Sequence, residues 1–336
     1  MNIKTFIGVG ENIHCTRIFK VGGAICKPLT NGGFGIHYKA GKENRVLPVP
    51  ESFTRTADWE AAKIKHCAVA IWQGTQGDQA AGKDYLHQLA ISQERSGATY
   101  LDINVDEYST DIDERIRLMQ WTVNEIQSAV KIPVSIDSSN EAILEAGLKA
   151  ADPKRGRPMV NSVSLERVSA IDVAARYKAV VVASAAGEKG MPNTVEERMD
   201  NLHRLIPILR QKGFTLDALH IDPLVFPIST DAQNGNRFLN TVSAIRKEYG
   251  PEIHIVAGLS NISFGMPNRK LINQVYSWLA VEAGADGGIV DPSQINASIL
   301  NALKPDAEDF KLARALLLGE DEYGMEYIAA SRDGRI

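Results

Sequence analysis

Asp and Asn residues end a series of short apolar runs along this 336-residue chain. Each run has the composition of a buried β-strand and then stops at a polar residue. The runs are Ala98–Asn104, Pro133–Asp137, Met159–Asn161, Leu219–Asp222, Ile255–Asn261 and Gly288–Asp291. A parallel strand that is buried on both faces is hydrophobic throughout, so polar residues at its carboxyl end need another explanation. In a (β/α)8 barrel this end carries the active site, with one or two residues from each strand.

The chemistry of these strand ends is that of carboxylates and carboxamides. The side chains are Asp102, Asn104, Asp137, Asn161, Asp222 and Asn261. Arg269 is the only cation that the pattern adds to them. Carboxylates accept hydrogen bonds and carboxamides both donate and accept, so the set suits a neutral polar heterocycle with N–H donors. A 2-amino-4-oxopyrimidine edge, as in a pterin, offers an amine and a ring N–H that one carboxylate can accept together.

Two other interpretations of the strand-end residues remain open. A strand-end Asp can cap the next helix, as Asp137 is placed to do before residues 138–140. Several carboxylates at the mouth of a barrel can also hold Mg²⁺ or Zn²⁺. The spacing does not favour a metal, because no His-x-His or His-Glu-x-x-His motif occurs and only Asp102 with Asn104 forms an i, i+2 pair. The adjacent pairs His14–Cys15 and His66–Cys67 have diverging side chains, so we expect no metal site at them.

The elements that position these residues alternate between strand-like and helix-like runs, which indicates a parallel sheet of βα units. We expect strands at 5–10, 98–105, 133–137, 158–164, 179–186, 219–226, 253–260 and 287–292. We expect helices at 78–96, about 110–130, 140–150, 168–177, 194–212, about 236–249, 270–284 and after Ser293. Eight strands with their helices predict one (β/α)8 barrel, that is, an α/β fold in a single domain over residues 1–336.

The stretch from about residue 16 to 58 does not follow this alternation. Glycine pairs and the segment Pro48–Pro50 interrupt it, and no helical period emerges. We predict an irregular insertion after the first strand, which would rise from the catalytic face of the barrel. Such an insertion would cover the pocket, contact a partner or a second subunit, or have no role in the chemistry.

Composition excludes several classes of protein. Hydrophobic residues make up 44% of the chain, and the formal net charge of −4 gives no basic field to hold nucleic acid or an anionic membrane. Three cysteines form no Cys-x-x-Cys pair. The first residues lack the apolar segment of a signal peptide, and no apolar run is long enough to span a bilayer. We expect a soluble cytoplasmic protein.

With these motifs in this order, the chain resembles the pterin-binding (β/α)8 enzymes. The superfamily contains dihydropteroate synthase, the folate domain of cobalamin-dependent methionine synthase, and corrinoid-dependent methyltetrahydrofolate methyltransferases. The matching motifs are Gly10-Glu11-Asn12, Asp102-Ile103-Asn104-Val105, Ile136-Asp137-Ser138-Ser139, Asn161-Ser162, Ile221-Asp222-Pro223, Gly258-Leu259-Ser260-Asn261-Ile262-Ser263 and Pro267-Asn268-Arg269. Each motif is weak alone, whereas the ordered set covers nearly the whole chain.

The resemblance implies a role for each matched position. It implies that Asn261 is the catalytic residue, beside N5 of the pterin. The implied substrate-binding residues are Asp102, Asn104, Asp137, Asn161, Asp222, Ser263 and Arg269. Among them, Asp137, Asn161 and Asp222 would hold the pterin. Two positions depart from the family: Asp106 stands where corrinoid methyltransferases often have Gly, and Phe264 stands where relatives carry a polar folate contact.

The branch of the family follows from two further motifs. Dihydropteroate synthases have Ser-Arg-Lys after strand seven and Arg-Val-His at strand eight, where this chain has Ser260–Ile262 and Ile289–Asp291. Without those cations a departing pyrophosphate would lack stabilisation. The resemblance therefore implies methyl transfer between N5 of tetrahydrofolate and the cobalt of a corrinoid, in one-carbon metabolism or the catabolism of methylated compounds.

Partners and alternatives complete the expectation. The chain has no Asp-x-His-x-x-Gly corrinoid motif, so cobalamin would arrive on a corrinoid protein or free in solution. The family usually forms homodimers. The alternatives are dihydropteroate synthase, a metal-dependent barrel lyase or hydrolase, and a folate-binding protein without catalysis.

Overall fold

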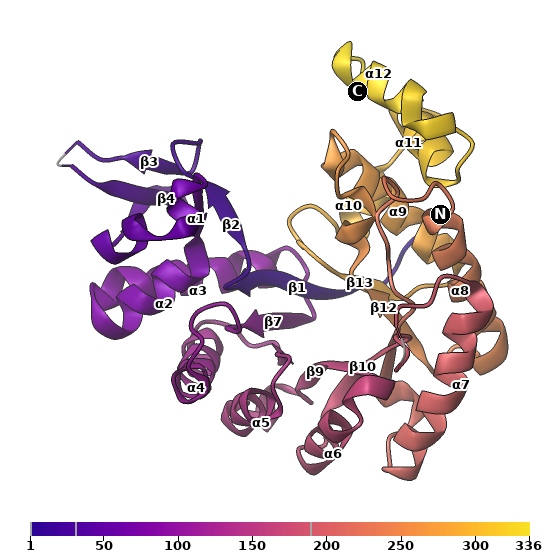
Figure 1. Cartoon of the computed structure of the whole chain (residues 1–336), viewed down its shortest axis with the longest axis horizontal. Coiled ribbons are helices and arrows are strands. Elements are labelled where there is room, and N and C mark those ends of the chain that lie inside the picture. Colours follow the sequence, from indigo (N-terminus) through magenta and orange to yellow (C-terminus); the bar gives the residue numbers. More distant parts are fainter. Residues whose placement is uncertain (1, 31, 189) are drawn as a thin grey trace. The chain divides into compact units, whose positions relative to one another are not determined.

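The computed structural model describes residues 2–30, 32–188 and 190–336. In it, eight parallel strands form a closed barrel in the order β1-β13-β12-β11-β10-β9-β8-β7 (Figure 1). They are β1 (Ile7–His14), β7 (Tyr100–Asn104), β8 (Val134–Asp137), β9 (Met159–Val163), β10 (Val180–Ser184), β11 (Leu219–Asp222), β12 (His254–Ala257) and β13 (Gly287–Val290). Helices follow the strands along the chain, which confirms the predicted (β/α)8 barrel.

Contacts within the chain divide it into two compact units. The first unit comprises residues 1–10, 96–100 and 159–336, and the second comprises residues 11–95 and 101–158. Each contains barrel strands with the helices that follow them. The single domain over residues 1–336 remains a prediction.

The second unit contains four longer helices. They are α2 (His66–Gln76), α3 (Gln79–Arg95), α4 (Ile112–Ala129) and α5 (Glu141–Ala150), followed by the 3₁₀ helix η2 (Pro153–Arg155). Asn140 begins α5, because its side chain accepts hydrogen bonds from the amides of Ala142 and Ile143. Asp111 begins α4 in the same way.

The insertion that the sequence predicted at 16–58 is more regular than expected. It contains β2 (Ile18–Lys20), β3 (Cys26–Pro28), β4 (Phe34–Ala40), β5 (Glu43–Pro48), η1 (Glu51–Arg55) and α1 (Ala57–Glu60), with β6 (Lys63–Lys65) just beyond it. Strands β3, β4 and β5 form an antiparallel sheet, and β2 pairs with β6. A two-residue turn at Gly41, with φ of 63°, sets the β4–β5 register, a local signal that a search for helical periodicity does not detect.

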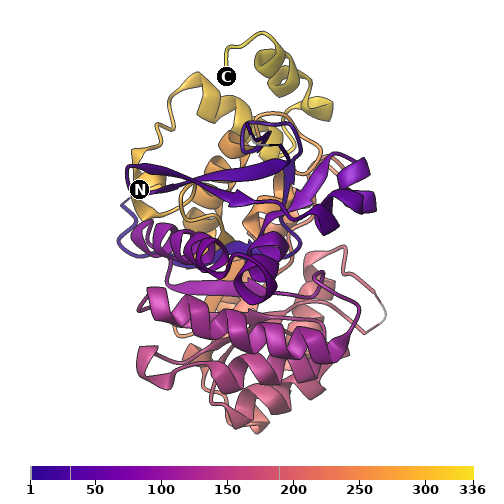
Figure 2. The same cartoon turned by 90° about the vertical axis from the view of Figure 1, so that its left-hand side faces the viewer.

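This insertion packs on the helices of its own unit. Figure 2 shows the β4–β5 hairpin, in indigo, beside the purple helices α2 and α3. Tyr38 on β4 donates a 2.6 Å hydrogen bond to Asp84 on α3, and Arg45 on β5 binds the same carboxylate at 2.7 Å. The hairpin is therefore fixed to α3 by both its strands.

The first unit contains the remaining helices. They are η3 (Leu165–Arg167), α6 (Ser169–Arg176), α7 (Val195–Gln211), η4 (Leu216–Ala218), α8 (Asn234–Tyr249), η5 (Leu259–Ser263), α9 (Arg269–Ala283), α10 (Ala297–Ala302), α11 (Glu308–Leu317), η6 (Glu322–Gly324) and α12 (Met325–Arg332). Thr194 and Glu197 form a capping box at the start of α7, where the sequence predicted a helix to begin.

Burial follows the barrel strands. Every residue of β10 and β13 is buried, as expected for parallel strands covered on both faces.

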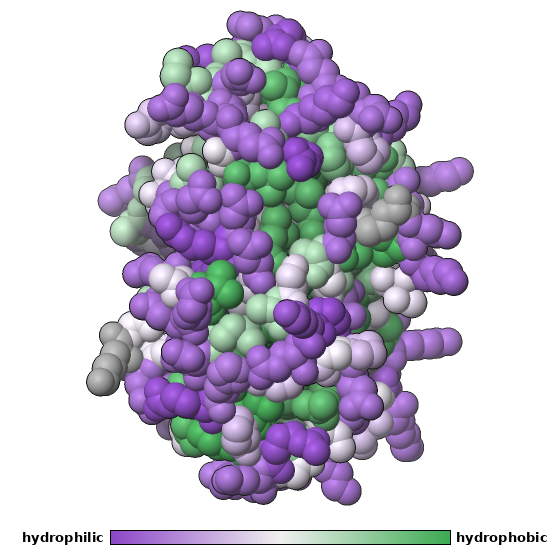
Figure 3. All heavy atoms as spheres, turned by 90° about the vertical axis from the view of Figure 1, so that its right-hand side faces the viewer, coloured by the Kyte–Doolittle hydropathy of each residue, from purple (hydrophilic) through white to green (hydrophobic). Residues whose placement is uncertain are grey.

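On the side of the molecule drawn in Figure 3, hydrophilic side chains are interspersed with apolar ones. Among the described residues, no helix combines the length and the apolar character that crossing a membrane requires.

Candidate active site

Three of the predicted site residues meet in the second unit, together with a histidine. We call His14, Asp102, Asn104 and Asp137 the His14 cluster. His14, Asn104 and Asp137 are the last residues of β1, β7 and β8, and Asp102 lies two residues before the end of β7. His14 Nε2 lies 2.9 Å from Asp102 Oδ2, and Asn104 Nδ2 donates a 2.9 Å hydrogen bond to Asp137 Oδ2. One nitrogen of His14 and one oxygen of each aspartate all lie within 4.8 Å of one another.

Burial makes this cluster electrostatically unusual. Asp102 is 0% exposed and His14 is 8% exposed. Burial lowers the pKa of His14, but the hydrogen bond and charge of Asp102, with the charges of Asp137 and Glu11, raise it above its ordinary value overall. Burial and the neighbouring charge of Asp102 raise the pKa of Asp137 to about 7, although His14 and Asn104 oppose the shift.

The cluster can therefore change its protonation near neutral pH. An ionised Asp137 accepts hydrogen bonds from N–H donors, and a protonated Asp137 donates one. The titrations of His14 and Asp137 depend on each other, because each charge shifts the pKa of the other group. The same three side chains could also hold a divalent cation, since imidazole and carboxylate are both metal ligands.

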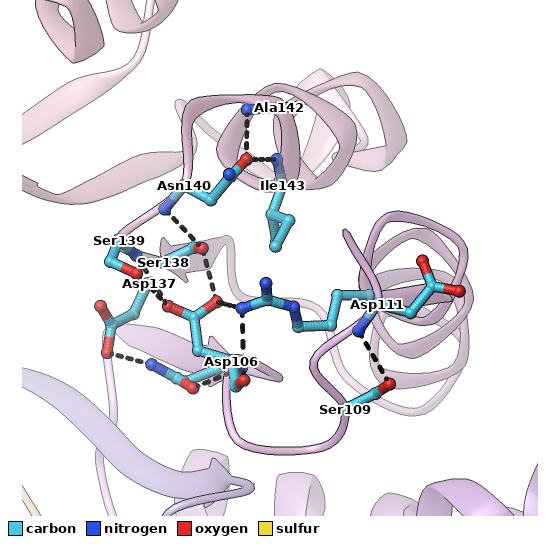
Figure 4. A network of polar contacts seen from close by, with 11 residues as sticks. Asp106, Ser109, Asp111, Asp137, Ser138, Ser139, Asn140, Ala142 and Ile143 are labelled. Carbon is cyan, nitrogen blue, oxygen red and sulfur yellow. Dashed lines mark hydrogen bonds and ion pairs between the residues drawn. The ribbon is translucent and has the colours of Figure 1, made fainter. Parts of the chain in front are cut away.

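Asp106 holds the loop that carries Asp137 (Figure 4). Its carboxylate accepts hydrogen bonds from the Ser138 hydroxyl at 2.6 Å and from the Ser139 amide and hydroxyl at 2.7 and 2.9 Å. Its own amide donates to Asn104 Oδ1 at 2.9 Å. We call this set of contacts the Asp106 clamp. It joins the loops after β7 and β8, and it gives a structural role to Asp106, one of the two positions at which the sequence departs from the pattern that it resembles.

The interpretation of Asp137 as a helix cap is wrong. Asn140 is the residue whose side chain caps α5, and the Ser138 hydroxyl accepts from the Asn140 amide at 3.1 Å. Asp137 instead ends β8 and faces Asn104. Its carboxylate is thus not committed to the first turn of the following helix.

Asp222 and Asn161 lie on strands of the first unit, Asp222 at the end of β11 and Asn161 in the middle of β9. Asp222 ends β11 and accepts a 2.8 Å hydrogen bond from the Leu224 amide. Burial raises the pKa of Asp222 to about 6, against the opposing effects of that hydrogen bond and of Arg198. Asn161 lies on β9 opposite Val182, where the register with β10 is irregular and Ser162 is skipped.

Asn261, Ser263 and Arg269 belong to one segment of the first unit, η5 and the start of α9. Arg269 Nε donates to the Ser263 hydroxyl at 2.9 Å, and Arg269 Nη2 donates to the Ser260 carbonyl at 3.1 Å. The guanidinium also lies 4.4 Å from the centre of the Phe264 ring. Ser263 is fully buried, so its hydroxyl acts here by holding Arg269. Phe264 thus supports the cation at the second position where the family pattern is broken.

The position of Asn261 depends on Gly258. A Cβ atom at residue 258 would lie 3.0 Å from Asn261 Nδ2, which is closer than ordinary contact. The backbone N–H of Asn261 also donates a 3.1 Å hydrogen bond to the Gly258 carbonyl. The absence of a side chain at Gly258 therefore leaves room for the carboxamide of Asn261.

The structure thus brings the predicted residues together in separate sets. Asp102, Asn104 and Asp137 form one, and Asn261, Ser263 and Arg269 form another. A single pocket lined by all of them remains a prediction. Sequence reasoning missed His14, which it had considered only as a partner of Cys15. A polar residue at the end of a barrel strand was the signal that could have found it.

Comparison with known proteins adds three findings. The family model described as pterin binding enzyme matches residues 77–291. A methylcorrinoid:tetrahydrofolate methyltransferase from Eubacterium limosum is 33% identical over 75% of this chain and 89% of its own length. A methionine synthase from Mycobacterium tuberculosis is 32% identical over 66% of this chain, which spans 20% of that much longer protein.

Solved structures agree on the fold. The dihydropteroate synthase of Xanthomonas albilineans, in complex with indole-2-carboxylic acid and 6-chloroguanine, superimposes with a TM-score of 0.55. The match covers 90% of this chain and 92% of that one at 17% identity. At this identity the likeness shows the barrel fold alone.

Proposed function

Because this chain belongs to the family of pterin-binding enzymes, we propose that it transfers a methyl group between N5 of tetrahydrofolate and the cobalt of a corrinoid. The observation that carries the proposal is the 33% identity to a methylcorrinoid:tetrahydrofolate methyltransferase over 89% of that protein. All eight site residues that the sequence predicted also lie within the matched range 77–291.

The polar residues of the site would have different roles in this reaction. In this proposal Asp137, Asn161 and Asp222 bind the N–H donors and ring atoms of the pterin, and Arg269 binds the folate. Asp102 and Asn104 act on Asp137, since Asn104 donates to its carboxylate and Asp102 raises its pKa. Ser263 acts on the folate through Arg269, which it holds at 2.9 Å.

When the methyl group moves from methyltetrahydrofolate to cobalt, N5 is the leaving group, and a neutral tertiary amine is a poor one. The methyl group leaves more readily when N5 gains positive character. The carboxamide of Asn261 would hydrogen-bond the protonated N5, and in the reverse direction it would orient the lone pair of neutral N5. A carboxamide is not a strong acid, so orientation and electrostatic stabilisation supply most of its effect.

The corrinoid is a methyl donor or acceptor in this scheme. We propose that it arrives on a separate corrinoid protein or free in solution, because the chain lacks the Asp-x-His-x-x-Gly motif. A homodimer and a cytoplasmic location remain predictions, and light scattering of the purified protein tests the dimer.

Methyl transfer from methylcob(III)alamin to tetrahydrofolate tests the function, with the visible spectrum of the corrinoid as the readout. We expect a spectral change that requires tetrahydrofolate. In Asn261→Ala, kcat falls about 100-fold while the Kd for tetrahydrofolate changes little, because the hydrogen bond matters most in the transition state. The exposed Asn193 provides the control variant Asn193→Ala, which keeps wild-type activity.

Two results would contradict this assignment. Equal losses of kcat and of folate affinity in Asn261→Ala would remove its catalytic role. No spectral change with free cobalamin or with a corrinoid protein would contradict methyl transfer itself. Condensation of a pterin pyrophosphate with p-aminobenzoate would then be the reaction to measure.

A further inference from the structure

Arg198 is a buried cation that the proposed chemistry does not use. It lies in the first turn of α7, and its side chain is 0% exposed. Among the residues that the structure describes, none hydrogen-bonds to Nε, Nη1 or Nη2 of its guanidinium. The ring centre of Phe226, four residues after Asp222, lies 5.4 Å from the guanidinium carbon, so the cation lies against the segment that follows β11. A buried charge without hydrogen bonds is costly, so its surroundings should contain a compensating charge.

The groups that act on Arg198 identify that charge. Burial lowers the pKa of Arg198, and the charge of Arg237 lowers it too. Tyr276 and the carboxylates of Asp222 and Glu197 act in the opposite direction and raise the pKa of Arg198. Burial raises the pKa of Tyr276 well above its usual range, so this phenol is neutral at physiological pH. Glu197 is exposed and bonds the amides of Asn193 and Thr194 in the capping box of α7.

Asp222, half-buried at the end of the strand that leads to Phe226, is therefore the carboxylate that can balance Arg198. Among the described residues, Arg237 is a further cation that acts on the pKa of Arg198, and it is paired with Asp231 at 2.6 Å. Burial raises the pKa of Asp222, whereas the hydrogen bond from the Leu224 amide and the charge of Arg198 lower it. His220 precedes Asp222 on the same strand and lies with its ring centre 4.8 Å from that of His254.

We propose that Arg198 is a positioning residue for Asp222, whose ionised form it maintains for binding the N–H donors of the pterin. This inference rests on the proposed function, because it assigns Asp222 to folate binding. It adds a residue outside the predicted site, on a helix rather than on a strand end. The positive charge of the Arg198 guanidinium then stabilises the ionised carboxylate of Asp222 at the end of β11.

A purely structural role for Arg198 makes a different expectation. If the side chain only stabilised the fold, an apolar replacement of similar length would weaken the protein. Replacing both members of a buried ion pair by hydrophobic residues often costs no stability, whereas removing one member leaves the other charge uncompensated. We therefore expect Arg198→Met to unfold at a lower urea concentration than the wild type at pH 9, where Asp222 is ionised, and to lose much less stability at pH 5, where Asp222 is protonated. A purely structural loss would be the same at both pH values.

The test is the pH dependence of tetrahydrofolate binding. In the wild type we expect binding to weaken as the pH falls through about 6, because protonated Asp222 no longer accepts two hydrogen bonds. Loss of the Arg198 charge raises the pKa of Asp222 further. In Arg198→Met this acid limb should move to higher pH by about one unit or more. Binding at pH 9 should be close to that of the wild type.

Three variants make the result specific. Arg198→Lys keeps the charge and should restore most of the wild-type profile. Arg237→Met removes the neighbouring charge that Asp231 already neutralises, and it should leave the acid limb in place. In an Asp222→Asn background, Arg198→Met should not change the pH dependence of tetrahydrofolate binding. If Arg198→Met does not fold, Arg198→Gln makes the same neutralisation with a polar side chain and carries the same expectation.

Two outcomes overturn the proposal: an acid limb that stays in place in the neutral variants, or one that moves equally in Arg237→Met. The ¹³C chemical shift of the Asp222 carboxyl, followed by NMR without folate, gives the same titration directly. A wild type that binds no tetrahydrofolate at any pH would contradict the proposed function. The NMR titration would still decide whether Arg198 controls the charge of Asp222.

Discussion

Asp137, which we propose to bind the pterin, lowers the stability of the folded protein at neutral and alkaline pH. Burial and the charge of Asp102 raise its pKa to about 7, whereas an unfolded chain would ionise it near pH 4. The folded protein therefore holds a proton that the unfolded chain releases between these two values. The free energy of unfolding falls as the pH rises through this range, and the loss is complete above about pH 7.

The variant Asp137→Asn tests this residue-scale conclusion. A carboxamide can still accept the hydrogen bond from Asn104, and it removes the repulsion from Asp102. A pKa about three units above that of the unfolded chain corresponds to a loss of about 4 kcal/mol of stability at pH 8. Because the titrations of Asp137 and His14 depend on each other, we assign about half of this loss to Asp137 and expect a gain of ~2 kcal/mol in the variant. Urea unfolding at pH 8 and pH 4 measures the gain, which should vanish at pH 4 while folate affinity is lost at both. Asp113→Asn, at an exposed position on α4, is the control. Equal stability of Asp137→Asn and the wild type at pH 8 would contradict the electrostatic account.

At the scale of elements, the 3₁₀ helix η5 places Asn261 through the close approach of its carboxamide to Gly258. The backbone of Gly258 has φ of −69° and ψ of 71°, close to the inverse γ-turn conformation, which is open to L residues such as alanine. An added methyl group would nevertheless lie 3.0 Å from Asn261 Nδ2. The added methyl group would therefore disturb the orientation of the Asn261 side chain, which we propose to be catalytic, and would affect the fold only weakly.

We expect Gly258→Ala to separate catalysis from stability. The carboxamide of Asn261 must shift by a few tenths of an ångström, and a displaced group loses transition-state stabilisation. The predicted result is a fall in kcat of about 10-fold or more, with a change in unfolding free energy below about 1 kcal/mol. Steady-state kinetics and urea unfolding of the same preparation check it. A wild-type kcat would show that Asn261 can move without cost.

For the whole molecule, closure of the barrel depends on close contact between β13 and β1. Gly287 pairs with Ile7, and a Cβ atom at residue 287 would lie 1.9 Å from the Ile7 carbonyl oxygen. The obstructing atom belongs to the backbone, so it cannot move aside as a flexible side chain would. Glycine is required here for packing, at the junction of the last and first strands of the barrel.

Gly287→Ala should therefore destabilise the barrel by about 3 kcal/mol or more, since overpacking a rigid backbone contact is among the costlier substitutions. Thermal unfolding monitored by circular dichroism measures the change. Gly8→Ala is the matched control on the same pair of strands, because its nearest neighbour would be the Gly97 carbonyl at an ordinary 3.4 Å. Similar losses in both variants would mean that the effect comes from strand propensity.

Sequence patterns located the barrel strands because short apolar runs lead into polar residues. Polar residues do end β7, β8 and β11, but Asn161 lies inside β9 and Asn261 lies beyond the end of β12. The patterns extended some strands too far: the run at 219–226 ends as a strand at Asp222, because Leu224 adopts φ of 68°. Helix α2 escaped prediction because it is buried on most sides and has no single apolar stripe. His14 escaped because its partner Asp102 lies 88 residues away, and only barrel folding brings them together.

The Asp106 clamp has a consequence for the rates of binding. The loop that follows Asp137 is held by three hydrogen bonds within the protein, so its geometry exists before any ligand arrives. A preformed loop loses little conformational entropy on encounter. The association rate should then be set by diffusion and docking of the ligand, and changes at the His14 cluster should appear in the lifetime of the complex.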